Sequence, residues 1–256
     1  SRVHPTYPWL NSHGRMSNLN NKTKAFINAT DLLAATPEMQ QQRGYADTLR
    51  EIRQQPATWL ATAELLRSTH AQELLRNVLS RRPSHMVLTG SGSSMYAGEC
   101  LASSLQLGLG LPVQSIASGT LLTHWSSVLP PGPGLLISLA RSGDSPESCG
   151  VVSRLLADAP DYRHLVITCN ASGKLATSYA GDPRVSVLTL DERTNDRSLV
   201  MTSSFTNLVL AGTGLLAQDG SDAQATAQIA HAVQELLDDQ AHALTAVTGE
   251  SFSNIV

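Results

Sequence analysis

Two short segments rich in glycine and serine carry residue types suited to holding an anion. The first is Thr89-Gly90-Ser91-Gly92-Ser93-Ser94-Met95, and the second is Ala140-Arg141-Ser142-Gly143-Asp144-Ser145-Pro146. Glycines let the backbone approach a ligand closely, and serine hydroxyls can donate hydrogen bonds to it. The second segment adds the guanidinium group of Arg141, a fixed cation. These residues favour an anion site, with ordinary capped turns as the alternative.

The second segment indicates a strand, a tight turn and a helix in succession. It follows a short apolar run at 135–140, which is typical of a strand buried on both faces. Ser145 suits a helix N-cap, and Pro146 suits the first helical position. Such a turn presents free backbone N–H groups and the positive end of a helix dipole, both of which favour a bound phosphate.

Strands and helices alternate over the middle of the chain. Strands are expected at 85–89, 112–117, 135–140, 163–169 and 184–190, and helices at 94–107, 120–125, 146–157, 174–180 and 201–218. This order predicts an α/β fold, with a five-stranded parallel sheet, helices on both faces and right-handed crossovers. Ligands of such sheets bind beyond the carboxyl ends of the strands. Both serine-rich turns therefore face one pocket if the first and third strands are neighbours.

Further helices are expected on either side of this region. Thr48-Leu49-Arg50-Glu51 fits a capping box for a short helix, and a longer helix should run from Pro56 to about Ser80. A last helix should run from Ala223 to about Val247, before residues at 252–256 that resemble the start of another strand. The expected organisation is a tag or flexible arm at 1–45, amino-terminal helices at 46–81, the alternating domain at 82–219 and a linking helix with a truncated second domain at 220–256.

The composition is that of a globular protein, with 41% hydrophobic and 15% charged residues and a net charge of −3. This charge gives no support for binding nucleic acid or an anionic membrane. Apolar stretches fall well short of the roughly 20 residues that a membrane-spanning helix needs. The three cysteines, Cys100, Cys149 and Cys169, lack metal-ligand spacing. They are expected to be small buried residues of a reduced, cytoplasmic protein.

Other chemical motifs find little support. The Gly90-x-Gly92 pair lacks the third glycine of a dinucleotide fingerprint, and no P-loop, G-x-S-x-G elbow or H-E-x-x-H pattern occurs. No metal and no organic cofactor is expected. His124 is expected on a helix face rather than as a ligand. The acids that follow the last strand could be general bases, but solvated turn acids are the favoured interpretation; they are Asp191, Glu192 and Asp196.

A third polar cluster follows the last strand, at 194–198 and 201–205. A loop with a helix cap explains it as well as a set of groups that bind sugar hydroxyls, and the residues alone leave both interpretations open.

Several of these motifs resemble the sugar isomerase (SIS) family. The resemblance is carried by Leu88-Thr89-Gly90-Ser91-Gly92-Ser93-Ser94, by residues 140–148 and by Ile167-Thr168-Cys169-Asn170. Residues 194–198, 201–205 and 51–56 resemble its AgaS branch in particular. Members of that branch are tagatose-6-phosphate ketose/aldose isomerases or galactosamine-6-phosphate deaminase-isomerases. The resemblance extends from about Tyr45 to the end of the chain.

The resemblance implies a three-layer α-β-α SIS domain with a flavodoxin-like sheet and a phosphorylated amino sugar as ligand. It also implies which residues bind that ligand, by matching the two serine-rich turns to those that hold the sugar and its phosphate in the family. These residues are Gly92, Ser93, Ser94, Arg141, Ser142, Asp144, Ser145 and, in the later Ser/Thr segment, Thr202. Arg141 stands where the family has a glutamine, and Asp144 where it has a glutamate.

AgaS-like proteins carry two SIS domains, and their catalytic acid–base groups lie in the second. The resemblance therefore implies that the catalytic residues lie outside this chain. The expected reaction of the whole protein converts galactosamine-6-phosphate to tagatose-6-phosphate and ammonia. The alternative is a non-catalytic phosphosugar-binding module. An unpaired SIS domain should expose an apolar face, so a homo-oligomer is expected.

Overall fold

The computed structural model describes residues 29–179, 181–216, 223–239 and 246. The chain divides into two units, one of which is Pro37–Asp239. The other comprises residues 1–36 and 240–256, and its described part contains helix α1 (Ala29–Ala34). The sheet and the candidate site belong to the Pro37–Asp239 unit.

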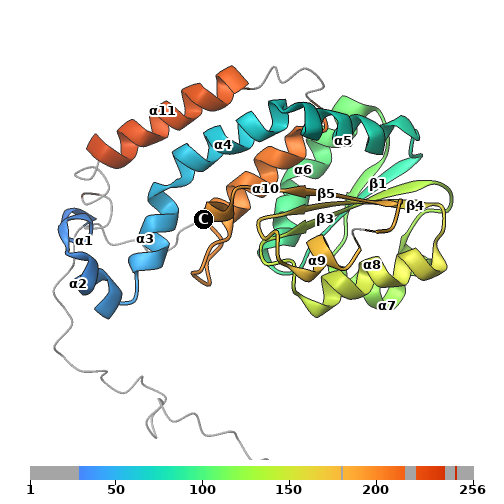
Figure 1. Cartoon of the computed structure of the whole chain (residues 1–256), viewed down its shortest axis with the longest axis horizontal. Coiled ribbons are helices and arrows are strands. Elements are labelled where there is room, and N and C mark those ends of the chain that lie inside the picture. Colours follow the sequence, from blue (N-terminus) through green and yellow to red (C-terminus); the bar gives the residue numbers. More distant parts are fainter. Residues whose placement is uncertain (1–28, 180, 217–222, 240–245, 247–256) are drawn as a thin grey trace, which may run out of the picture. The chain divides into compact units, whose positions relative to one another are not determined.

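The core of that unit is a five-stranded parallel sheet (Figure 1). Its strands are β1 (His85–Thr89), β2 (Val113–Ser115), β3 (Gly134–Ala140), β4 (Tyr162–Thr168) and β5 (Val185–Thr189). They lie in the order β2-β1-β3-β4-β5, and every neighbouring pair is parallel. The order reverses between β1 and β3, which makes their carboxyl ends the topological switch point. The predicted α/β fold and the adjacency of the first and third strands are confirmed.

Helices cover both faces of the sheet, which gives three layers (Figure 1). One face carries α4 (Gln55–Arg67), α5 (Thr69–Ser80), α6 (Ser93–Leu109) and α10 (Ser203–Thr213). The other carries α7 (Ser118–Val128), α8 (Pro146–Asp158) and α9 (Lys174–Thr177). Side chains alternate between the two layers along each strand, so Leu88 and Ile137 pack in the larger core and Val87 and Leu136 in the smaller one.

The amino-terminal helices differ from the prediction in two places. After α2 (Pro37–Gln42), helix α3 (Ala46–Arg53) begins before Thr48, so the capping-box prediction is wrong. The expected single helix from Pro56 to Ser80 is two helices, α4 and α5. Ser68 separates them because its backbone is extended, with ψ 144°, and its hydroxyl accepts a hydrogen bond from the backbone N–H of Ala71 at 3.2 Å.

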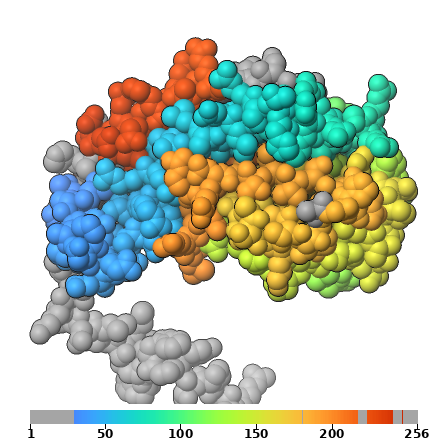
Figure 2. Space-filling model, in the orientation of Figure 1, coloured from blue at the N-terminus to red at the C-terminus, as the bar shows by residue number. Residues whose placement is uncertain are grey.

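Smaller differences occur toward the end of the chain. Helix α10 begins at Ser203 rather than Met201, and a short 3-10 helix, η1 (Glu192–Thr194), precedes it. Helix α11 (Ala223–Asp239) packs along α4, and Figure 2 shows their surfaces in contact. The strand start expected at 252–256 lies outside the described residues. Within the described part of the chain, no helix combines the length and apolarity needed to cross a membrane.

The cysteines do not share one environment. Cys169 is buried as expected, and burial raises the pKa of its thiol to about 12. Cys149 is half-buried. The expectation is wrong for Cys100, which is exposed on α6 because its neighbour Leu101 takes the position that faces the core.

Candidate functional site

The two serine-rich turns meet at the switch point and line one pocket of about 160 Å³. This serine-lined pocket lies beyond the carboxyl ends of β1 and β3, where an open parallel sheet binds ligands. Its walls come from the two turns, the end of β3, the start of α8 and one residue before α10. The lining residues are Ser91, Ser94, Leu139, Ala140, Arg141, Ser142, Gly143, Ser145, Ser148 and Met201.

A chain of hydroxyl groups joins the two turns. Ser91 Oγ lies 3.2 Å from Ser145 Oγ and 3.1 Å from Ser148 Oγ. Ser148 Oγ lies 3.3 Å from the hydroxyl of Ser118, which in turn lies 3.2 Å from Thr89 Oγ1. Hydroxyl protons can rotate, so these groups can turn their donors toward a bound oxyanion while the network holds their oxygens in place.

The second turn is held firmly by its surroundings. Ser145 caps α8 and accepts a hydrogen bond from the backbone N–H of Ser148 at 3.3 Å. Gly143 adopts φ +70°, a conformation that favours glycine. The carbonyl of Ser142 accepts a hydrogen bond from Asn170 Nδ2 at 2.9 Å, and a Cβ on Gly173 would lie 2.2 Å from that oxygen. The turn therefore presents the positive end of α8 to the pocket in a fixed geometry.

The first turn owes its shape to two glycines. Gly92 precedes α6 with φ +58°. Gly90 packs against the start of the same helix, where a Cβ would lie 2.7 Å from Ser94 Cβ. Larger residues at either position would move the serines of this turn.

A loop at 196–202 reaches the pocket from the last strand, and helix α3 holds it there. The fully buried carboxylate of Glu51 accepts hydrogen bonds from the backbone N–H groups of Arg197 at 2.6 Å and Ser198 at 3.1 Å, and from the Ser198 hydroxyl. Figure 2 shows the surface of this loop against that of α3. The Ser198 carbonyl in turn accepts a hydrogen bond from Arg141 Nη1 at 2.8 Å. Glu51 thus indirectly sets the position of the pocket's cation.

Asp196 is not the solvated turn acid that was expected. It is 5% exposed, and its carboxylate accepts hydrogen bonds from the backbone N–H groups of Thr202 at 2.9 Å and Ser204 at 2.8 Å, and from the hydroxyls of Ser203 and Ser204. These contacts satisfy donors at the start of α10, which has no side-chain cap of its own at Thr202. For these residues the loop-and-cap interpretation of the third polar cluster holds. Of the other two acids, Glu192 is exposed, whereas Asp191 is half-buried and its carboxylate binds Arg193.

The structure brings four of the eight predicted site residues to the pocket: Ser94, Arg141, Ser142 and Ser145. The other four are not among its lining residues. Gly92 and Ser93 are exposed at the start of α6, and Asp144 Oδ1 accepts a hydrogen bond from the Lys174 backbone N–H at 3.0 Å. Thr202 Oγ1 is buried and has no hydrogen-bond partner within the described part of the chain. Roles in sugar binding for these eight residues stay predictions.

Sequence reasoning did not single out Ser91, Ser148 or Met201 as site residues, although all three line the pocket. Ser91 lies in the first turn, and Ser148 follows the N-cap Ser145 by three residues, so a helical count places it on the same end of α8. Met201 gives no comparable signal. Its Sδ accepts a weak hydrogen bond from Ser94 Oγ at 3.8 Å.

The described lining of the pocket favours an anion over a cation. Arg141 is the one ionisable side chain among its described lining residues, which include no carboxylate and no imidazole. His124 is exposed on α7, with Nδ1 2.7 Å from Thr123 Oγ1. Among the described residues, no group of three or more histidines, cysteines and acids could hold a metal ion. The pocket can thus hold a phosphate, but its described residues offer no general base.

Comparison with known proteins points to enzymes that act on phosphorylated sugars. The chain is 39% identical over 204 residues to an AgaS protein of Streptomyces coelicolor, covering 78% of this chain and 52% of the relative. It is 36% identical over 184 residues to the D-galactosamine-6-phosphate deaminase AgaS of a Shewanella species, covering 70% of this chain and 48% of the relative. The chain thus spans about half the length of these relatives.

A solved structure agrees with these relatives. The tagatose-6-phosphate ketose/aldose isomerase of Escherichia coli superposes with a TM-score of 0.70 at 30% identity, covering 79% of this chain and 55% of that one. Models of protein families were also compared, and none matches the chain.

Proposed function

This chain belongs to the sugar isomerase (SIS) family, in its AgaS branch, and from that premise we propose that the serine-lined pocket binds the phosphate group of a phosphorylated amino sugar. One observation carries the proposal: Arg141, three linked serine hydroxyls and the N-terminus of α8 converge at the switch point of the sheet. Each of these groups favours an oxyanion, and together they leave a small polar pocket for it.

As the substrate we propose galactosamine-6-phosphate, which is named for the Shewanella relative. The whole protein would open the sugar ring, transfer a proton between C1 and C2 and, with one water molecule, release ammonia to leave tagatose-6-phosphate. Binding of the remote phosphate would position the reacting carbons. The acid–base groups would come from outside the serine-lined pocket, since Arg141 is the one ionisable group among its described lining residues.

A non-catalytic phosphosugar-binding module is the second candidate for this polypeptide. The observation in its favour is the same absence of a carboxylate or imidazole from the described lining of the pocket. Assays of ammonia release separate the two candidates, because a binding module takes up the phosphosugar without turnover.

A cytoplasmic location and self-association belong to the same proposal. A phosphorylated sugar carries charge that prevents free passage across a membrane, so its enzymes work where it is made. Association is supported by large apolar side chains on the surface, among them Leu107 at 88% and Leu199 at 94% exposure.

A thermal-shift titration with galactosamine-6-phosphate tests the proposed ligand, with galactosamine and inorganic phosphate as controls. A ligand that binds only the folded state raises the melting temperature. The phosphosugar should raise it more than either control at equal concentration. No shift with any of the three would contradict the proposal.

Two variants connect the binding to the pocket. Arg141→Met should weaken phosphosugar binding at least about tenfold, because it removes the charge and every hydrogen-bond donor of this side chain, and Ser142→Ala should weaken binding by a smaller factor. Ser80→Ala is the matched control, since Ser80 is exposed at the end of α5 and its hydroxyl bonds to the carbonyl of Asn77, away from the pocket. Unchanged affinity in Arg141→Met would refute the assignment of the pocket.

A further inference from the structure

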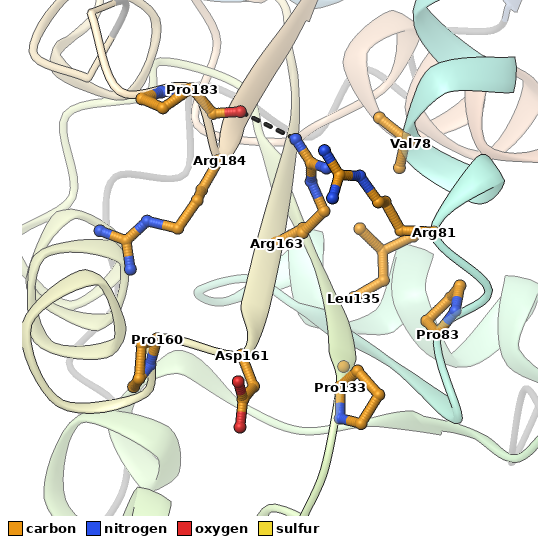
Figure 3. A pocket seen from close by; sticks show the side chains of 11 residues that line it. Val78, Arg81, Pro83, Pro133, Leu135, Pro160, Asp161, Arg163, Pro183 and Arg184 are labelled. Carbon is orange, nitrogen blue, oxygen red and sulfur yellow. Dashed lines mark hydrogen bonds between the residues drawn. The ribbon is translucent and has the colours of Figure 1, made fainter.

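A second pocket, of about 380 Å³, lies at the opposite edge of the sheet, beyond the amino ends of β3, β4 and β5 (Figure 3). We call it the arginine pocket. It shares no lining residue with the serine-lined pocket. Its walls combine three arginines, one acid and an apolar floor; the residues used below are Arg81, Arg163, Arg184, Asp161, Val78 and Leu135.

The three arginines differ in their charged partners. Arg184 is neutralised by Asp182, with Nη2 3.0 Å from Oδ2, and it points away from the other two in Figure 3. In the view of Figure 3 the guanidinium groups of Arg81 and Arg163 overlap, and both residues line this pocket. Among the described residues, neither forms an ion pair with a carboxylate.

The backbone supports this placement of like charges. Arg163 Nη2 donates a hydrogen bond to the Pro183 carbonyl at 2.8 Å, which orients the side chain without neutralising it. Arg81 stands at the end of α5, where Arg82 takes the left-handed conformation with φ +49° and its N–H bonds to the Leu79 carbonyl at 3.0 Å. Two guanidinium groups that face one pocket repel each other unless an anion lies between them.

We propose that the arginine pocket binds a small phosphate ester. The phosphate would lie between Arg81 and Arg163, whose planar donor sets match its oxygens. The carbon body of the ligand would lie on the apolar floor formed by Val78 and Leu135. Asp161 lines the same pocket and disfavours a second anionic group on the ligand. The site does not depend on the function proposed for the serine-lined pocket.

Calorimetric titration with phenyl phosphate and inorganic phosphate tests the site in the full chain. The Arg81→Gln/Arg163→Gln double variant should bind phenyl phosphate at least about tenfold more weakly than the unaltered protein, because both charged donors are lost. Arg76→Gln is the matched control, since Arg76 is exposed on the same helix outside the pocket, and it should bind normally. Phenyl phosphate should bind at least about threefold tighter than inorganic phosphate, because its apolar ring is transferred from water to the apolar floor of the pocket.

A parallel series in the Arg141→Met background separates the two pockets, since binding in the arginine pocket should survive that change. The melting temperature without ligand shows whether the double variant folds. If the melting temperature is lowered, the Arg81→Lys/Arg163→Lys variant is used in place of the glutamine double variant. It should still weaken binding of phenyl phosphate several-fold, because the paired donor geometry of the guanidinium groups is lost. Equal affinity in the double variant and the unaltered protein, or an equal loss in Arg76→Gln, would overturn the proposal.

Discussion

Acid should destabilise this fold through one buried histidine. His164 lies in β4 with 0% of its surface exposed, and neither ring nitrogen has a hydrogen-bond partner within the described part of the chain. Burial, reinforced by the positive charge of Arg184 and opposed by Asp182, lowers the pKa of His164 to about 4. The neutral ring is therefore the folded form at neutral pH.

The difference between the two states sets the sign and size of the effect. In the unfolded chain the imidazole of His164 binds a proton below its ordinary pKa of 6.5. In the folded protein the same imidazole binds this proton only near pH 4 and below. Stability is thus unaffected by this group above pH 6.5 and falls as the pH drops from 6.5 to about 4. Each pKa unit corresponds to about 1.4 kcal/mol, so the loss from His164 is about 3 kcal/mol.

The perturbation is His164→Leu, measured by urea unfolding at several pH values between 7.5 and 4. Between pH 7.5 and 4, the free energy of unfolding should fall by about 3 kcal/mol less in the variant than in the unaltered protein. At pH 7.5 it should be more stable by about 1 kcal/mol, because two unpartnered polar atoms leave the core. Comparing the two proteins cancels the contribution of His85, whose pKa is also lowered by burial.

His70→Leu is the control, because His70 is exposed on α5. It should keep the pH dependence of the unaltered protein. If His164→Leu also keeps that dependence, the acid sensitivity does not come from His164 and the reasoning fails.

Three further changes probe the candidate site and the surface. Glu51→Gln should lower the free energy of unfolding by about 2–3 kcal/mol, because it removes a charged acceptor of four donors, one of them the Arg50 guanidinium, and should weaken phosphosugar binding; denaturant unfolding and the thermal-shift titration measure the two effects. Gly173→Ala should destabilise by at least about 1–3 kcal/mol, since its Cβ would lie 2.2 Å from the Ser142 carbonyl, and an unchanged melting temperature would contradict this. Leu199→Ser should leave the melting temperature unchanged but reduce self-association in sedimentation experiments, and equal association in both proteins would exclude the Leu199 surface as an interface.

Local patterns in the sequence account for the sheet and both turns. The apolar run at 135–140 and the signals at Ser145 and Pro146 predict β3 and α8 with bounds that differ by one residue at most. The helix break at Ser68 was missed, although a serine N-cap signal stands there, because the apolar spacing continues across it. The spacing of apolar residues shows which face of a helix packs against the core. When two successive helices turn the same face to the core, this spacing continues across the break between them.

Local sequence patterns could not predict the long-range contacts that complete the pocket. Glu51 fits a local capping box in sequence, but its partners Arg197 and Ser198 lie 146 and 147 residues away. The hydroxyl of Ser118 belongs to a different βα unit from that of Ser148, and only the crossing of the chain at the switch point joins them. Residue types at a turn indicate what a site can bind, whereas these long-range contacts decide which of the residues face it.

The contact between Glu51 and the 196–202 loop also bears on the order in which the molecule is assembled. Its two partners lie 146 and 147 residues from it along the chain, and contacts of that sequence separation are costly to form early. The parallel sheet and both serine-rich turns can form before it, but the loop that fixes Arg141 can take its place only when α3 has docked. During folding, the serine hydroxyls should therefore reach their positions in the serine-lined pocket before the guanidinium group of Arg141 does.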